Sequence, residues 1–149
     1  MHKQFFKLLF LCVTASCNSQ QQLNAEQQQI VDAARTNFVF VEGGTFIMGN
    51  NSLPIAAEHE VTLDSYAIAK YETTFKEFDV FTDVNGLDKL AAEYRDGELF
   101  GLNYGAKLMG WYKANDYCKW LGEQLNLPLS LPTEAQWEYA ARSLSLIHI

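Results

Sequence analysis

The sequence predicts an α+β domain in which strand-forming segments come first and helices follow. Aromatic and β-branched residues alternate with other residues in "FVFVEGGTFIMG" and "HEVTLDSYAIAKYETT", which favours strands. Two capping boxes, "TFKE" and "TEAQ", and an apolar stripe between them favour helices. The chain has 149 residues, 48% of them hydrophobic, so it is long and apolar enough for one domain with a core.

The charge of the chain excludes one class of partner. The formal net charge is −7, and the lysines and arginines form no cluster. Binding to nucleic acid without sequence preference needs clustered basic side chains that neutralise phosphates. We therefore expect no nucleic-acid partner.

Residues 1–16 have the pattern of an export signal. Lys3 and Lys7 provide a basic start, and the apolar run "LLFLCVTA" is much shorter than the ~20 residues of a membrane-spanning helix. The following "VTASC" resembles a bacterial lipobox, which predicts that Cys17 is lipidated and attaches the chain to membrane lipid in the cell envelope. The alternative is an ordinary secretory signal that is cleaved nearby.

Residues 17–36 are predicted to form a polar tether that begins at the lipidated cysteine. The stretch "NSQQQLNAEQQQ" is too poor in apolar side chains to offset the entropy of folding, and "IVDAARTN" adds at most a short helical turn. Cys12 leaves with the signal and Cys17 is acylated, so Cys118 remains as the free thiol. An intramolecular disulfide is therefore not expected.

The segment around Gly43 and Gly44 is predicted to be a β-hairpin, because two glycines allow the positive φ angles of a tight turn. A glycine pair also fits a phosphate-binding loop, but no Lys-Ser/Thr follows it, so the turn is favoured. Further on, His59–Thr74 is predicted to form two short strands or one bent strand.

The first predicted core helix starts at Thr74, whose side chain caps it together with Glu77, and ends near Asn85-Gly86. Its phenylalanines are three residues apart, which places them on one core-facing row. The row consists of Phe75, Phe78 and Phe81.

Residues 87–110 contain glycines and charged residues and are predicted to be an irregular connection.

A second helix is predicted within residues 110–126, because its apolar residues recur three and four apart. A nucleophilic cysteine needs a cationic or helix-N-terminal setting, so Cys118 is predicted to be a small core residue. The predicted apolar stripe consists of Trp111, Ala114, Cys118, Leu121 and Leu125.

The third helix is capped by Thr133 and Gln136, and Pro132 is predicted to pack on Trp137 as a hydrophobic staple. Trp137, Ala140 and Ala141 are expected to form its apolar face. Residues 143–149, "SLSLIHI", lack the glycine that commonly ends a helix. We expect a break in the sequence at about Arg142 and treat the last seven residues as an unmatched tail.

The quoted strand segments and "DYCKWLGEQLNLPLSLPTEAQWEYAAR" resemble, in the same order, the signature segments of the formylglycine-generating-enzyme family, also called the sulfatase-modifying-factor domain. The resemblance places the N-terminal part of that domain at residues 37–142. It implies a fold related to the C-type-lectin-like fold, with little regular secondary structure and incomplete in this chain.

The resemblance also implies a chemistry. Members of the family oxidise a sulfatase cysteine to formylglycine, using oxygen and a copper ion held by two cysteines, and bind calcium structurally. Those ligands lie C-terminal to the "WEYAAR" helix, beyond Ile149 of this sequence. No catalytic or metal-binding residue is therefore assigned in the chain, and His59 is expected to form a hydrogen bond at a strand edge or in the core rather than to bind a metal.

Two functions remain open at this point. The first is an exported, lipid-anchored oxidase that acts on sulfatase polypeptides, of which this chain is an inactive N-terminal part. The second is a non-catalytic lipoprotein that binds envelope assembly proteins, as in gliding motility or secretion. The lipobox followed by a glutamine-rich tether favours the second.

Overall fold

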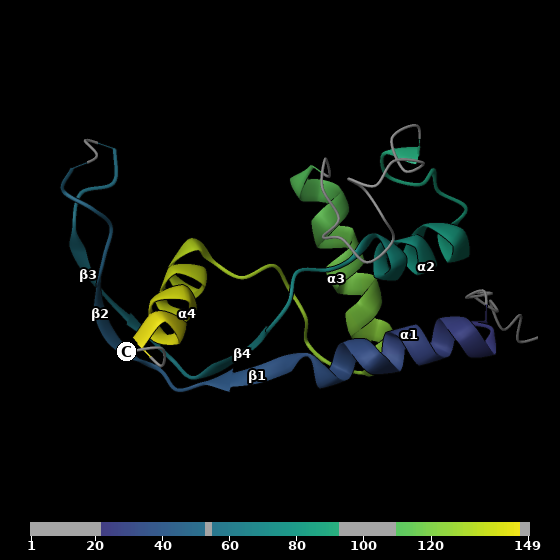
Figure 1. Cartoon of the computed structure of the whole chain (residues 1–149), viewed down its shortest axis with the longest axis horizontal. Coiled ribbons are helices and arrows are strands. Elements are labelled where there is room, and N and C mark those ends of the chain that lie inside the picture. Colours follow the sequence, from purple (N-terminus) through teal and green to yellow (C-terminus); the bar gives the residue numbers. More distant parts are fainter. Residues whose placement is uncertain (1–21, 53–54, 93–109, 147–149) are drawn as a thin grey trace, which may run out of the picture.

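The computed structural model describes residues 22–52, 55–92 and 110–146 and shows a mixed α+β architecture. Three helices gather at one end of the molecule, and a fourth lies beside a β-ribbon at the other end (Figure 1). One helix comes first, four strands follow it, and three helices complete the described part of the chain. In order, the elements are α1 Ala25–Thr36, β1 Phe38–Val41, β2 Gly44–Met48, β3 His59–Leu63, β4 Tyr66–Ala69, α2 Phe75–Asn85, α3 Trp111–Leu125 and α4 Glu134–Leu146.

The strands form one interrupted antiparallel ribbon. β1 pairs with β4 and β2 pairs with β3, giving two two-stranded sheets. The register is continuous through both, because each step forward from Phe38 to Met48 is matched by one step back from Ala69 to His59. The connection that reverses the chain is therefore the loop between β2 and β3.

The predicted hairpin at the glycine pair is wrong. Neither Gly43 nor Gly44 has a positive φ angle, and β1 and β2 do not pair with each other. A Cβ on Gly43 would lie 2.3 Å from the carbonyl oxygen of Leu63. Gly43 is thus required for the close approach of two backbones, a use of glycine that resembles a turn signal in sequence. The prediction of two short strands in the later segment is confirmed by β3 and β4.

The local signals of α2 are confirmed. The Thr74 hydroxyl accepts a hydrogen bond from the Glu77 amide at 3.2 Å, and the Glu77 carboxylate accepts one from the Thr74 amide at 2.6 Å. Gly86 ends the helix in the left-handed conformation, with φ of 63°. The capping box and the glycine therefore fix both ends.

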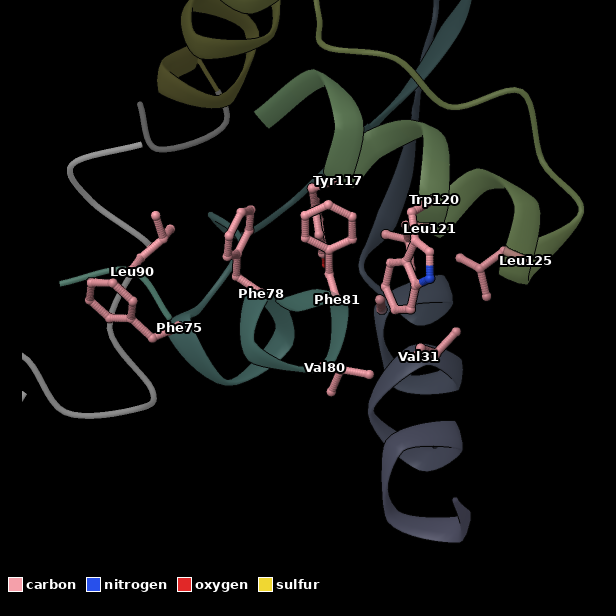
Figure 2. Packing of buried hydrophobic residues seen from close by; sticks show 11 residues of the cluster. Val31, Phe75, Phe78, Val80, Phe81, Leu90, Tyr117, Trp120, Leu121 and Leu125 are labelled. Atoms are coloured by element: carbon pink, nitrogen blue, oxygen red, sulfur yellow. The ribbon is translucent and has the colours of Figure 1, made fainter. Parts of the chain in front are cut away.

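The core lies among α1, α2 and α3, and aromatic rings of α2 and α3 pack at its centre between aliphatic side chains (Figure 2). Phe78 is 1% exposed, and its ring centroid is 5.3 Å from those of both Phe81 and Tyr117. Burial raises the pKa of Tyr117 far above its usual range, and nearby Glu77 adds to this effect. The predicted row of phenylalanines on α2 is buried and forms the centre of this cluster.

The prediction that residues 25–29 stay unfolded is wrong, because they form the first turns of the 12-residue α1. Asn24 and Gln27 make a capping box that was not recognised in the sequence. Val31 is 2% exposed in the core. Its burial helps to offset the conformational entropy that the chain loses when α1 forms, although most side chains of this segment are polar. Arg35 also donates a hydrogen bond to the carbonyl of Leu125 at 2.5 Å.

The buried face of α3 differs from the predicted stripe. Leu121 and Leu125 are buried as expected, but Trp111 is 63% exposed. Tyr117 and Trp120 are buried in its place, because they lie on the face of α3 that packs against α2, where both rings contact Phe81. Within the three described ranges, no helix is long and apolar enough to cross a bilayer. The predicted signal segment, Cys17 and most of residues 87–110 lie outside those ranges.

Candidate functional site

Helix α4 contains most of the signature segment "LPTEAQWEYAAR", and it packs against the ribbon formed by β2 and β3 (Figure 1). The predicted capping box of α4 is confirmed: the Thr133 amide donates to the Gln136 side chain at 2.9 Å, and the Gln136 amide donates to the Thr133 hydroxyl at 3.1 Å. Ala140 is buried, but the prediction that Trp137 and Ala141 lie on the packed face is wrong, since both are exposed. Other side chains of α4 meet the ribbon instead.

Arg142 and Glu138 hold the end of β2. Arg142 donates hydrogen bonds to the carbonyl oxygens of Ile47, at 2.8 Å, and Gly49, at 3.0 Å. The Glu138 carboxylate accepts from the Gly49 amide at 3.0 Å and lies 2.5 Å from the Arg142 guanidinium. Gly49 is thus held at both its amide N–H and its carbonyl oxygen, and we call Glu138 and Arg142, with Ile47 and Gly49, the Gly49 clamp.

Two aromatic side chains of the ribbon also contact α4, one through its ring and one through its hydroxyl. The rings of Phe46 and Tyr139 meet edge to face with centroids 5.1 Å apart, and the Tyr66 hydroxyl donates to the Gln136 carbonyl at 2.5 Å. Burial, followed by proximity to Tyr139, raises the pKa of Tyr66, so this hydroxyl keeps its proton and remains a donor. Gly44 is small enough to admit the Tyr139 hydroxyl, which would lie 2.8 Å from an added Cβ.

The clamp residues were not singled out from the sequence. Glu138 and Arg142 are four residues apart on α4, which is the spacing at which opposite charges meet on a helix surface. That spacing was a usable signal. Their bonds to Ile47 and Gly49, about 90 residues earlier, have no counterpart in any local pattern.

Replacing Arg142 by methionine should lower the free energy of unfolding by about 1 to 2 kcal/mol, because two hydrogen bonds to backbone carbonyls are lost. The ion pair with Glu138 adds little to this figure, since the Arg142 side chain is 49% exposed and solvent screens the charge. Urea titration of the two proteins measures the difference. Lys119→Met on the exposed face of α3 is the matched control and should change stability by less than about 0.5 kcal/mol; equal losses in both would contradict the role of Arg142.

A shallow groove of about 490 Å³ lies at the other end of the molecule, between α1 and the start of α2. Its floor includes apolar side chains of α1, and Tyr71, which is 61% exposed, forms part of the wall. Its lining contains no cysteine or histidine, and Glu77 is already used to cap α2. This arrangement offers a contact surface. The lining residues are Ile30, Ala33, Asn37, Tyr71, Glu72, Thr74, Lys76 and Glu77.

Cys118 is the one cysteine in the described ranges, and it is partly buried in the middle of α3 beside the core. Burial raises the pKa of its thiol, which disfavours the thiolate that binds copper or attacks a substrate. A copper ion held by two cysteine thiolates therefore does not fit the donor set of the described residues. The prediction that Cys118 acts as a packing residue agrees with its position.

The Cys118 thiol should react slowly with a neutral disulfide reagent in the folded protein at pH 8, and several-fold faster after unfolding in urea. Burial both blocks access and lowers the thiolate fraction, and because the pKa is raised, the rate in the folded state should continue to rise at a higher pH than in the unfolded chain. Absorbance of the released reagent measures both rates, and the Cys118→Ala chain subtracts any other thiol. Equal rates in the folded and unfolded protein would contradict this assignment.

His59 lies at the start of β3, where its Nδ1 is 2.9 Å from the carbonyl oxygen of Ala57. The expected strand-edge hydrogen bond is thus confirmed. Across residues 22–52, 55–92 and 110–146, no three His, Cys, Asp or Glu side chains come together as a metal-binding group. Calcium ligands implied by the resemblance would have to come from other residues.

Comparison with known proteins gives two results. A family model described as "Sulfatase-modifying factor enzyme 1-like domain" matches residues 21–145, which include α1 and most of α4. Over 127 aligned residues, the chain is 29% identical to "Serine/threonine-protein kinase pkn1" of Chlamydia caviae, 29% to the protein of that name from Chlamydia trachomatis serovar L2, and 32% to that from Chlamydia pneumoniae. In each case the match covers 71% of this chain and 19% of the relative, so the chain spans about a fifth of these proteins.

Proposed function

Because the chain belongs to the sulfatase-modifying factor enzyme 1-like family, we propose that it carries such a domain in an exported, lipid-anchored envelope protein, and that residues 22–146 serve protein binding and not cysteine oxidation. The observation that carries this proposal is the exposed aromatic pair Trp111 and Tyr112 at the first turn of α3. Cys118, the one cysteine among the described residues, lies before the segments to which the resemblance assigns the copper-binding cysteines, so it is not one of them.

The use of the signature residues supports the same proposal. Glu138, Tyr139 and Arg142 are engaged in the Gly49 clamp and the adjoining aromatic contact, so their polar groups face the ribbon. They position α4 and have no substrate-facing role in this arrangement. These residues of α4 therefore supply part of the framework of the domain.

Exposed aromatic side chains provide a surface for a protein partner. Trp111 is 63% exposed and Tyr112 80% exposed at the first turn of α3, with ring centroids 5.4 Å apart. Tryptophan and tyrosine are enriched in protein interfaces, because they bury a large area at a low cost in side-chain entropy. An envelope assembly protein is the partner class that this surface and the proposed anchoring favour.

The kinase activity named for the chlamydial relatives is not proposed for this chain. The match corresponds to 19% of those proteins. Gly43, the residue considered for a phosphate loop, lies against the backbone of residues 63–65 in the ribbon, where an added Cβ would already collide. The glycine pair therefore has a structural use.

The alternative is a sulfatase-oxidising enzyme whose copper site uses cysteines outside the described residues. Oxygen uptake separates the two functions when it is measured on the protein together with any residues that follow Ile149: this protein is incubated with copper and a sulfatase-motif peptide that contains the target cysteine. We expect no peptide-dependent uptake above that of the Cys118→Ala chain and no aldehyde on the peptide by mass spectrometry. Peptide-dependent uptake with aldehyde formation would establish the oxidase and refute our proposal.

Cross-linking tests the binding role directly. A photoreactive phenylalanine analogue at position 112, in the protein expressed in a bacterial envelope, should give discrete adducts with another protein. The same analogue at Lys119, two turns along α3 on its exposed side, is the matched control and should give none. Absence of adducts at position 112 would contradict a partner at this surface.

A further inference from the structure

The start of α1 is fixed by its own cap. The Asn24 amide donates to the Gln27 side chain at 3.0 Å, and the Gln27 amide donates to the Asn24 side chain at 2.9 Å. Such a reciprocal cap stabilises the first turn by roughly 1 kcal/mol. The start of α1 is therefore fixed at Asn24.

Helix α1 is also held by the core, so it cannot unwind to release more chain. Val31 and Ala34 are 2% and 6% exposed within the hydrophobic cluster. Arg35 joins the last turn of α1 to the end of α3 through the Leu125 carbonyl. Unwinding α1 would expose these side chains to water and break the contact with α3.

The chain between the proposed lipid anchor and α1 is short. Seven residues, Asn18 to Asn24, separate Cys17 from Ala25. Fully extended, they span about 25 Å. A domain of this size has a radius of gyration of roughly 14 Å, so the tether is shorter than the domain is wide.

The β2–β3 loop lies at the opposite end of the molecule from the start of α1 (Figure 1). The base of this loop is held by Asn51 and Glu58, whose side chains meet at 2.8 Å, and Ile55 is 97% exposed. The two ends of the long axis are therefore distinct, one next to the anchor and one far from it.

The charge of the ribbon disfavours its lying on a bilayer. Residues 38–69 contain four acidic side chains and no lysine or arginine. The headgroups of bacterial membranes include anionic lipids, which repel such a surface within a Debye length of about 8 to 10 Å. The acidic residues are Glu42, Glu58, Glu60 and Asp64.

We infer that the anchor holds the start of α1 at the bilayer surface and turns the β2–β3 loop and the adjoining α4 away from it. This inference rests on the proposed lipidation of Cys17. It goes beyond attachment, because it assigns an orientation. A 20-residue flexible tether, as composition alone suggested, would impose none.

Energy transfer to the membrane tests the orientation. The acylated full-length protein, in a Cys118→Ala background, is placed in vesicles of phosphatidylethanolamine and phosphatidylglycerol with a headgroup-linked acceptor. A donor dye is attached at Gln29→Cys on α1 or at Ile55→Cys in the loop; both positions are exposed. We expect transfer from position 29 to be several-fold more efficient than from position 55.

A tether variant isolates the cause. Insertion of a Gly/Ser segment of about 20 residues after Gln20 should remove most of the difference between the two positions, because the domain then reorients freely. Equal transfer from both positions in the unextended, acylated protein would overturn the inference, as would an unchanged difference after the insertion. Incorporation of labelled palmitate that is lost in Cys17→Ser verifies the anchor separately; no incorporation would refute lipidation and the inference together.

Discussion

Replacing Phe78 by alanine is expected to lower the free energy of unfolding by about 3 to 5 kcal/mol, because a large buried ring is removed and the cavity collapses only partly. Phe78 is 1% exposed and contacts Phe81 and Tyr117 at the meeting point of α2 and α3. The loss therefore includes favourable ring contacts as well as burial. Urea titration followed by circular dichroism measures the change.

The matched control is Phe40→Ala, which removes the same ring from an exposed position. Phe40 is 75% exposed on β1, so its removal should change stability by less than about 0.5 kcal/mol. A loss below about 1 kcal/mol at Phe78 would show that the aromatic cluster is not the core. A similar loss at both positions would contradict the assignment of inside and outside.

Replacing Gly49 by alanine should cost about 2 to 4 kcal/mol, through two effects that act at the same atom. Its φ of 100° is strained for any residue with a side chain, and an added Cβ would lie 2.6 Å from the carbonyl oxygen of Ala56. Relief of that collision would move the peptide unit that Arg142 and Glu138 hold. Thermal unfolding and urea titration measure the loss.

Gly86→Ala separates strain from collision. Gly86 also has a left-handed backbone, with φ of 63°, but an added Cβ would meet nothing within 4 Å. It should therefore cost about 1 to 2 kcal/mol, the strain alone. If Gly49→Ala were no more costly than Gly86→Ala, the close packing of the β2–β3 loop base would be contradicted.

Signals that act over a few residues were predictable from the sequence. The capping box at Thr74 and the glycine at position 86 are complete within one helix, and both ends of α2 are where they indicate. The capping box at Thr133 likewise fixes the start of α4. In these cases, the hydrogen-bonding partners are close neighbours in sequence.

Signals that depend on distant partners could not be resolved. A glycine pair permits a tight turn and also permits a close backbone approach, and the second use at Gly43 depends on residues 63–65. The exposure of Trp111 is a similar case: periodicity defines a stripe, but the aromatic surface of α2 decides which side of α3 is buried. Helix α1 depends on contacts of Val31 and Arg35 with the core and with α3.

One part of the candidate site was predictable from the sequence and one part was not. The family signature indicated the right segment, residues 131–142, but did not indicate the role of its side chains. The Gly49 clamp joins side chains of α4 to backbone atoms of β2 that lie about 90 residues earlier. The resemblance therefore indicated the family, and the structure indicated that these residues hold α4 on the ribbon.

Hydrogen exchange of the Gly49 amide tests this central claim most directly, because that amide donates to the Glu138 carboxylate at 3.0 Å. We predict slow exchange by NMR in the unmodified protein and much faster exchange in Glu138→Ala and Arg142→Ala, while the core amides of α2 keep their protection. Fast exchange of the Gly49 amide in the unmodified protein, or unchanged exchange in both variants, would contradict the structural role of the signature residues.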